Sequence, residues 1–256
     1  MKKVALLGPE GTYTHQAAKK YFGEFEPDFC STIRDVFKSD TEIKFVPVEN
    51  SLGGGVSDTV DLLREKDNEI TAEIALPIRH ALISDSDLEE IEVIKSHPQA
   101  LAQCQELITE HGWEEVEADS TAKAVEQLET GEAALASEIA AELNDKQILR
   151  KSVQDKDTNT TRFFVLNGPA EAHEKASLIL EPGEDRPGLL HSMLSCFAGH
   201  QVNLSRIRSR PTKKKLGEYY FYVEAEAADE RLEPAIKCLE TYAEVKALGR
   251  YSRGGE

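Results

Sequence analysis

The stretch KFVPVENSLGGGVSDTVDLL, residues 44–63, combines three patterns that together indicate an α/β fold. It begins with the strand candidate 44–48, which is apolar after Lys44, continues through the mostly polar and glycine-rich run 49–55, and ends in the helical pattern of 57–63. A short apolar run bounded by turn residues predicts a buried strand, and apolar residues at helical spacing predict a helix. The stretch therefore predicts strand, loop and helix in succession.

The same succession occurs at two other places in the first half of the chain. One copy comprises 4–7, 8–12 and 14–22, and the other comprises 92–95, 96–98 and 99–111. The segments 121–129 and 133–143 predict two more helices, and 70–83 predicts an extended connection. Such alternation is typical of a parallel sheet with helices on its faces.

The loops after these strands are expected to form one binding region. Each loop lies at the carboxyl end of a strand and at the amino end of the next helix. Free N–H groups at helix amino ends attract anions, and open α/β sheets bind ligands at this edge. A return of the chain through 157–166 predicts a two-lobed domain with a cleft between its lobes.

The last third of the chain has a different order of predicted elements. A polar, alanine-rich break at 169–174 predicts a linker. The pattern then predicts strands at 176–180, 202–209, 217–225 and 245–248, and helices at 188–197 and 233–242. The order βαββαβ is typical of a ferredoxin-like domain. Such small domains commonly pair, so we expect a homodimer or homotetramer.

The net charge of −17 limits the classes of partner that the protein is expected to bind. Nucleic-acid binding requires a surplus of Lys and Arg to neutralise phosphates, so we exclude that class. The basic run Lys213-Lys214-Lys215 lies between two predicted strands and is expected to form the tip of a hairpin. Two interpretations of the acidic excess stay open: a salty cytoplasm, in which carboxylates keep the surface hydrated, and an ordinary acidic cytosolic protein.

The cysteines and the amino terminus predict a cytoplasmic protein with reduced thiols. The four cysteines, at 30, 104, 196 and 238, have no paired spacing, and no Cys/His cluster of zinc type occurs, so we expect no metal. The apolar run after Met1 is too short for a signal peptide, and no stretch reaches membrane-spanning length.

One polar cluster, Glu49-Asn50-Ser51, precedes three glycines. A carboxylate, an amide and a hydroxyl in one loop can orient a polar ligand, and glycines let the backbone approach it closely. The alternative is a strand-end turn in which Ser51 or Ser57 caps the next helix. Taken alone, this cluster favours the turn.

Two further clusters lie in equivalent loops. In the first, Ser96 begins a loop and Gln103 lies one helical turn beyond Gln99, so both glutamines can share a helix face; alternatively, Ser96 is a cap and the glutamines are solvated. In the second, Arg162 suits bidentate binding of a carboxylate or forms a structural ion pair, and Thr161 is a hydrogen-bond donor or an ordinary strand residue. The three clusters together favour a site.

Four ordered runs resemble the motifs of the prephenate dehydratase family. They are GPEGTYTHQAA (8–18), VPVENSLGGGV (46–56), SHPQALAQC (96–104) and NTTRF (159–163), and the C-terminal part resembles the ACT domain that follows in that family. The resemblance implies an α/β fold with a two-lobed catalytic domain similar to type II periplasmic binding proteins, followed by a ferredoxin-like ACT domain. It places the catalytic domain at 1–168, with lobes at 1–76 plus 158–168 and at 77–157, and the ACT domain at 175–253. It leaves no room for a preceding chorismate mutase, so we expect a monofunctional chain.

The resemblance also implies an activity and a set of site residues. The expected reaction is decarboxylative dehydration of prephenate to phenylpyruvate, water and carbon dioxide, a step of phenylalanine biosynthesis. The residues expected to act in catalysis are Glu49, Asn50, Ser96, Gln103 and Thr161, and those expected to bind the substrate are Thr12, Ser51 and Arg162.

The chemistry agrees with these residue types. Prephenate is a dianion, which Arg162 and helix amino ends can bind without a metal. Departure of its ring hydroxyl needs a hydrogen-bond donor, for which Thr161 is suited, whereas Glu49 could supply the proton only if burial raised its pKa. That assignment stays open. Because the reaction is driven by formation of an aromatic ring, no cofactor is expected.

The ACT domain implies regulation, with L-phenylalanine as the expected effector. The family's effector motifs match Gly188-Leu189-Leu190 and Arg208-Ser209-Arg210-Pro211, and Asn203-Leu204 is expected to offer backbone groups to the amino acid. Leu189 replaces a small residue and Arg208 replaces an acid, which leaves the identity and strength of the effector open. The alternative is a domain that only dimerises the chain.

Other functions remain possible on the sequence. Arogenate dehydratase acts on the aminated substrate, and no residue chooses between the two. A non-catalytic amino-acid sensor would need the same lobes but not the combination of Thr161, Glu49 and Gln103.

Overall fold

The computed structural model describes residues 1–169, 174–184, 186–215, 217–226 and 230–254. The chain divides into two compact units, the first formed by 1–56 and 75–163 and the second by 57–74 and 164–255. Strands β5 (Ile70–Pro77) and β11 (Thr160–Leu166) have residues in both units. The linker expected at 169–174 lies largely outside the described residues.

In the first unit, β1 (Lys2–Leu7) is the central strand of a parallel group. It pairs with β2 (Phe25–Cys30) on one side and with β3 (Ile43–Asn50) on the other. Helices α1 (Tyr13–Phe22) and α2 (Ile33–Lys38) connect these strands, and the short β4 (Gly54–Gly55) pairs back on β3. The expected succession of strand, loop and helix is thus confirmed here.

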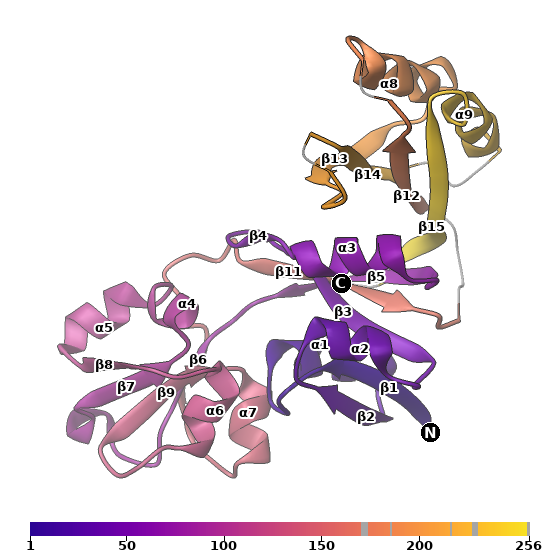
Figure 1. Cartoon of the computed structure of the whole chain (residues 1–256). Coiled ribbons are helices and arrows are strands. Elements are labelled where there is room, and N and C mark those ends of the chain that lie inside the picture. The colour runs from indigo at the N-terminus through magenta and orange to yellow at the C-terminus, as the bar shows by residue number, and fades with distance from the viewer. Residues whose placement is uncertain (170–173, 185, 216, 227–229, 255–256) are drawn as a thin grey trace. The chain divides into compact units, whose positions relative to one another are not determined.

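A second sheet in the same unit has helices on both faces. Its order is β10 (Ile148–Arg150), β6 (Ala81–Ile83), β9 (Glu132–Ala136), β7 (Val93–Ser96) and β8 (Glu114–Glu117), and a 3-10 turn at Leu88–Glu90 precedes β7. Helices α4 (Pro98–Leu101) and α5 (Gln105–His111) pack on one face, and α6 (Thr121–Glu126) and α7 (Glu138–Leu143) pack on the other (Figure 1).

The expected helix at 133–143 is wrong in its first half. Residues Glu132–Ala136 form the buried strand β9, and only Glu138–Leu143 is helical. Ala133 and Leu135 face one core, whereas Ala134 and Ala136 face the other. Alanine and leucine favour helices locally, but burial of both faces of a strand outweighs that preference.

The second unit contains an antiparallel sheet with two helices. The strand order is β13 (Leu204–Pro211), β14 (Tyr219–Ala225), β12 (Lys175–Pro182) and β15 (Ala243–Gly254), and the helices are α8 (Leu189–Gly199) and α9 (Leu232–Leu239). The core contains Leu178, Met193, Phe197, Val223 and Leu239. The expected order βαββαβ is confirmed, and the basic run 213–215 lies between β13 and β14 as expected.

The expectation that all four thiols are reduced is wrong. Cys196 of α8 and Cys238 of α9 form a disulfide with a Cα–Cα distance of 5.6 Å, whereas Cys30 and Cys104 are free. The two partners lie 42 residues apart in the sequence. They meet because α8 and α9 pack side by side on the same core, which spacing along the chain does not reveal.

Helix α3 and the first part of strand β5, which precede the C-terminal region in sequence, also belong to the second unit. Helix α3 (Ser57–Glu65) is bound through Arg64, which donates two hydrogen bonds to Glu181 at 2.8 and 2.7 Å. Strand β15 pairs in parallel with β5 through Ser252 opposite Ala72 and Gly254 opposite Ile74.

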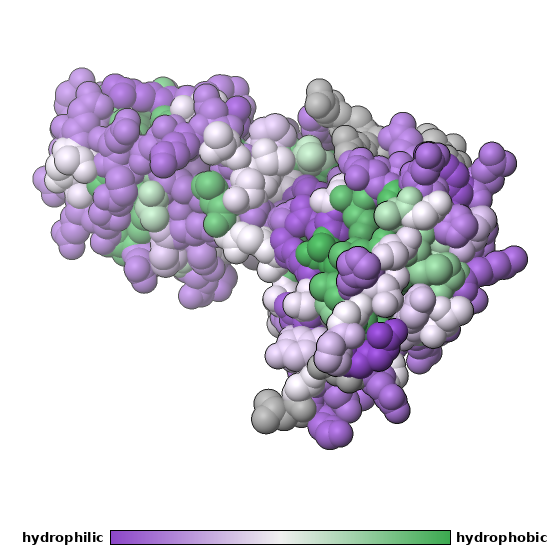
Figure 2. Space-filling view, turned by 90° about the horizontal axis from the view of Figure 1, so that it is seen from above, coloured by the Kyte–Doolittle hydropathy of each residue, from purple (hydrophilic) through white to green (hydrophobic). Residues whose placement is uncertain are grey.

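The surface is largely hydrophilic. The face in Figure 2 shows one broad group of apolar residues and smaller, scattered ones elsewhere. Within the described residues, none of the helices combines the length and the hydropathy of a membrane-spanning segment.

Candidate active site

A cavity of about 250 Å³ in the first unit brings together the loops that the sequence singles out. The amino ends of three helices contribute to it, through Thr12 and Tyr13 of the α1 region, Gln99 of α4, and Ser120 before α6. Of the expected site residues, Thr12, Asn50, Gln103 and Thr161 line the cavity; the other four lie nearby and do not line it.

The side chain of Asn50 has a fixed orientation. Its Oδ1 accepts hydrogen bonds from the backbone N–H groups of Leu52 and Gly53, at 3.0 and 2.8 Å. Its Nδ2 therefore faces the cavity, where it donates to Asn159 Oδ1 at 2.7 Å and to Thr161 Oγ1 at 2.9 Å. The loop after β3 thus fixes Asn50 so that its NH2 group, and not its oxygen, faces the cavity.

Thr161 receives a hydrogen bond and keeps its own hydrogen. Because Asn50 Nδ2 can only donate, Thr161 Oγ1 is the acceptor in that bond. The hydroxyl hydrogen of Thr161 then remains available to a bound molecule. Among the described residues, neither a histidine nor a carboxylate is hydrogen-bonded to this hydroxyl.

The side-chain amides of Asn50, Asn159 and Gln103 form a hydrogen-bonded row that ends at a buried histidine. Asn159 Nδ2 donates to Gln103 Oε1 at 2.7 Å, and His80 Nε2 lies 3.0 Å from the same oxygen. On the other side of the ring, His80 Nδ1 lies 2.6 Å from the hydroxyl of Tyr13. Burial lowers the pKa of His80, with a smaller opposing effect of Gln103, so the ring is neutral near pH 7.

Arg162 and Glu49 form an ion pair beside the cavity. Arg162 Nη1 donates to Glu49 Oε2 at 2.9 Å, and both side chains are about one-sixth exposed. The structural ion pair, which was the alternative for Arg162, is thus present, and binding of a substrate carboxylate by Arg162 stays a prediction. In this bond Glu49 is an acceptor.

The hydroxyls of Ser51 and Ser96 form hydrogen bonds with backbone groups and do not line the cavity. Ser51 Oγ donates to the carbonyl of Thr158 at 2.8 Å and accepts the N–H of Thr160, which ties the loop after β3 to β11. Ser96 is fully buried and donates to the carbonyl of Leu135 at 2.6 Å. Thr12 caps α1 by accepting the N–H of His15 and also lines the cavity.

Sequence reasoning missed three residues of this site. Asn159 lies in the NTTRF run, and Tyr13 lies in the GPEGTYTHQAA run, so each could be found from its motif. His80 lies at the end of the extended segment 70–83 with no pattern around it, and only the fold brings it to the cavity.

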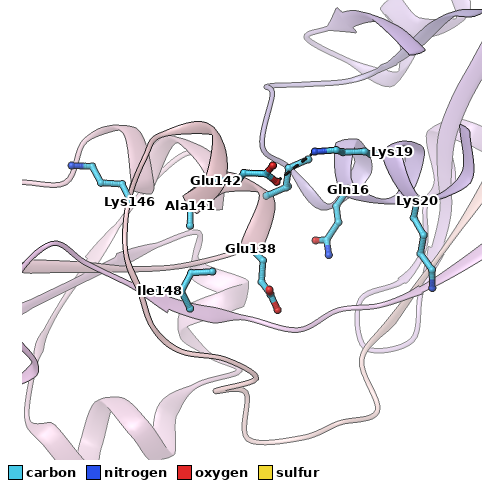
Figure 3. Close-up of a pocket in the computed structure, with 9 residues that line it drawn as sticks. Gln16, Lys19, Lys20, Glu138, Ala141, Glu142, Lys146 and Ile148 are labelled. Carbon is cyan, nitrogen blue, oxygen red and sulfur yellow. Dashed lines mark hydrogen bonds and ion pairs between the residues drawn. The ribbon is translucent and has the colours of Figure 1, made fainter. Parts of the chain in front are cut away.

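A larger hollow of about 570 Å³ lies outside this site (Figure 3). It is lined by charged residues of α1 and α7 together with Lys146, and most of these charges are paired: Lys19 contacts Glu142 at 3.4 Å, and Glu138 contacts Lys151. The hollow therefore offers less unpaired charge to an anion than its lysines suggest.

The second unit has its own cavity of about 1000 Å³. Four of the expected effector residues line it: Gly188, Leu189, Leu190 and Ser209. The other four, Asn203, Leu204, Arg210 and Pro211, do not line it. Arg210 instead donates to Asp61 of α3, at 2.8 and 3.1 Å.

Comparison with known proteins finds two family models that match successive parts of the chain. Residues 4–171 match the family model described as prephenate dehydratase, and residues 183–243 match the ACT domain. A prephenate dehydratase of Methanocaldococcus jannaschii is 40% identical over 267 residues, which cover 98% of each chain. An arogenate dehydratase/prephenate dehydratase of Arabidopsis thaliana is 34% identical and is covered to 72%.

Two solved structures are similar over 98% of this chain. A prephenate dehydratase from Arthrobacter aurescens in complex with L-Phe has a TM-score of 0.87 and 30% identity, and 90% of that chain is covered. A protein described as GqqA, a novel type of quorum quenching acylase, has a TM-score of 0.88 and 29% identity, and 98% of that chain is covered.

Proposed function

The chain belongs to the prephenate dehydratase family, and on this premise we propose that it catalyses the decarboxylative dehydration of prephenate. In this reaction the bond from the ring to the carboxylate breaks and releases carbon dioxide. The electron pair of that bond completes the aromatic ring as the bond to the ring hydroxyl breaks. The hydroxyl takes up one proton and leaves as water, and the ring product is phenylpyruvate.

The observation that carries this proposal for the site is the direction of the Asn50–Thr161 hydrogen bond. Asn50 donates to Thr161 at 2.9 Å, so the hydroxyl hydrogen of Thr161 can point to the leaving oxygen. A donor aimed at developing negative charge stabilises the transition state more than the ground state. Glu49 accepts from Arg162, which supports Thr161 rather than Glu49 as the donor.

Binding of a dianion is supported by the amino ends of α1, α4 and α6 around the cavity. Their free N–H groups carry partial positive charge. Arg162 adds a guanidinium close by, so we propose that it contributes to binding together with Thr12 and Ser51. This supplies a local positive field in a chain of net charge −17.

The test is formation of phenylpyruvate from prephenate by the purified protein, with arogenate as the competing substrate. We expect turnover of prephenate that persists after treatment with a chelator, since the reaction needs no cofactor. Turnover of arogenate alone would reassign the substrate. Failure of both, in a folded sample, would favour an amino-acid sensor.

Acyl transfer is less well supported than dehydration, although one similar structure is described as an acylase. An acylase that uses a hydroxyl nucleophile needs a base within hydrogen-bond distance of it. In the described part of the site Thr161 Oγ1 accepts from the amide of Asn50, which is not a base, and the hydroxyl that does contact a histidine belongs to Tyr13, a weaker nucleophile that is buried against the ring.

We also infer that L-phenylalanine binds the ACT domain and regulates the enzyme. The cavity of about 1000 Å³ has room for an amino acid, and Gly188 and Ser209 line it. Leu189 lines this cavity with only 6% of its surface exposed, so most of its side chain packs in the domain core and leaves the cavity open to an effector. We keep Asn203, Leu204, Arg210 and Pro211 as candidates for contact in an assembled oligomer.

The remaining assignments are proposals of the same kind. We propose a catalytic domain over 1–168 and an ACT domain over 175–253, in a cytoplasmic homodimer or homotetramer. Strand β13 supports pairing, because it is the outer strand of its sheet and Ile207 on it is 41% exposed. The mass of the native protein in solution tests the assembly.

A further inference from the structure

We propose that His80 and Tyr13 are positioning residues for this reaction: His80 donates from Nε2 to Gln103, and Tyr13 holds His80 in that tautomer. Through the amide row of Gln103, Asn159 and Asn50, the pair keeps the hydroxyl of Thr161 pointing toward the substrate. The inference rests on the proposed function, because it assigns a role in the chemistry at Thr161.

The direction of the row begins at the backbone. The N–H groups of Leu52 and Gly53 can only donate, so they fix Asn50 Oδ1 as the acceptor and Nδ2 as the donor. Asn159 must then present Oδ1 to Asn50 and Nδ2 to Gln103. Each amide orientation follows from the one before it.

The same logic decides the tautomer of His80. Gln103 presents Oε1 to Asn159, and an amide oxygen cannot donate. The contact of 3.0 Å between this oxygen and His80 Nε2 is a hydrogen bond only if Nε2 carries the hydrogen. Nδ1 of the neutral ring is then a bare acceptor.

Tyr13 supplies the matching donor. Its hydroxyl lies 2.6 Å from His80 Nδ1 and 3.1 Å from the carbonyl of Arg79, both of which can only accept, and we assign its one hydrogen to the shorter contact with Nδ1. Burial raises the pKa of Tyr13 well above its ordinary value, with a smaller effect of Cys104, so the hydroxyl stays protonated. The two rings meet edge to face with centroids 5.5 Å apart, which holds the pair in place.

Both ring nitrogens of His80 are therefore occupied by protein groups. His80 lines the cavity but is only 3% exposed, and neither nitrogen is left as a free acid or base. This favours a positioning role over direct proton transfer.

The test compares three replacements of His80. In His80→Gln the side-chain amide can donate from a position close to Nε2, whereas in His80→Asn the donor lies nearer to Nδ1, and His80→Leu has none. We expect His80→Gln to keep kcat within a few-fold of wild type. We expect His80→Asn and His80→Leu to lose on the order of 10- to 100-fold in kcat, the size of loss that misplacement by about 1 Å causes, with KM little changed.

Tyr13→Phe provides a second test in a double-mutant cycle. It should lower kcat in the wild-type background and have little further effect in the His80→Gln background, because Tyr13 acts through the histidine ring. Additive losses in the two backgrounds would overturn the positioning role of Tyr13. Equal inactivity of the Gln, Asn and Leu variants, all folded, would overturn it for His80 and indicate direct catalysis.

A readout independent of turnover separates this inference from the proposed function. NMR of the wild-type protein with nitrogen-labelled histidine should show His80 as the neutral Nε2–H tautomer. The Nδ1–H tautomer would overturn the inference even if prephenate is turned over. Conversely, the expected tautomer in a protein that does not turn over prephenate would leave the network intact and refute the activity.

Discussion

At the scale of single residues, the site depends on which atoms donate. The row from Asn50 to His80 consists of neutral groups, so each bond has a direction that a single atom exchange can reverse. This makes isosteric variants more informative than truncations, because they change the donor pattern and leave the shape of the cavity.

Replacement of Thr161 tests the hydroxyl alone. Thr161→Val keeps the shape and removes the donor, so kcat should fall on the order of 10²- to 10³-fold, the usual effect of one such donor. Thr161→Ser keeps the hydroxyl and should retain most of kcat. Steady-state turnover of prephenate by both variants checks this, and near-normal turnover by Thr161→Val would remove Thr161 from the mechanism.

Asn50→Asp should reverse the start of the row. The carboxylate still accepts from Leu52 and Gly53, but it then accepts from Thr161 as well, which withdraws the hydroxyl hydrogen from the substrate. We expect a fall in kcat on the order of 10²-fold. Asn68→Asp is the matched control, because Asn68 Oδ1 already accepts from Asn167 and an acid there keeps that bond. Equal turnover by the two variants would contradict the directional row.

At the scale of elements, the carboxylate of Asp61 binds helix α3 to the β13–β14 region within the second unit. Asp61 accepts hydrogen bonds from Arg210, Lys213 and Tyr220. Burial alone would raise the pKa of Asp61, but these bonds outweigh it and lower the pKa from 3.8 to about 2. Three side chains of the β13–β14 region thus converge on one carboxylate.

Asp61→Asn should therefore destabilise the protein in a pH-dependent way. The shift corresponds to about 2 kcal/mol of unfolding free energy. Because the folded pKa is depressed, this contribution is complete above pH 3.8 and is lost as pH falls toward 2. Chemical denaturation of both proteins checks this: the difference between them should be full at neutral pH and shrink in acid. A constant difference would contradict it.

Strand β15 passes β5 too closely for a side chain at Gly249. A Cβ there would lie 2.3 Å from the carbonyl oxygen of Ile70, and the residue has φ of +137°. Gly249→Ala should cost about 1–3 kcal/mol of unfolding free energy. Gly199→Ala, where a Cβ meets nothing within 4 Å, is the matched control and should be neutral or stabilising. Equal denaturation midpoints would refute the close approach.

Many of the elements were predictable from sequence, but the helix expected at 99–111 is interrupted between Leu101 and Gln105, and no element was expected at Phe25–Cys30 or Ile33–Lys38. Strand–loop–helix patterns located β1, β3 and β7 with their loops because periodicity is a local signal. The strand at Glu132–Ala136 was missed because its alanines and leucine favour a helix until both faces are buried. Asn50 and Thr161 were found from motifs, but the orientation of the amide depends on Leu52 and Gly53 and could not be predicted from residue type.

At the scale of the whole molecule, the disulfide is the covalent link that the sequence did not predict. Cys196–Cys238 closes a segment with a separation of 42 residues, which in the chain-entropy model corresponds to about 4 kcal/mol of unfolding free energy. The double variant Cys196→Ala/Cys238→Ala should unfold at a lower temperature, and reductant should lower the melting temperature of wild type but not of this variant. Cys30→Ala is the control. An unchanged wild-type melting temperature in reductant would show that the bond is absent in solution.

Strand β15 has a consequence for how this chain could be divided or recombined. Its residues 243–251 pair with β12, and its last residues, 252–254, pair with β5 from an early part of the sequence. Removal of everything after 168 would strip one side of Ala72–Ile74 of its backbone partners and leave a bare strand edge open to aggregation. A gene cut at the apparent linker would therefore not yield a self-sufficient catalytic module, and a transplanted ACT domain would have to bring its final strand in register with a new host.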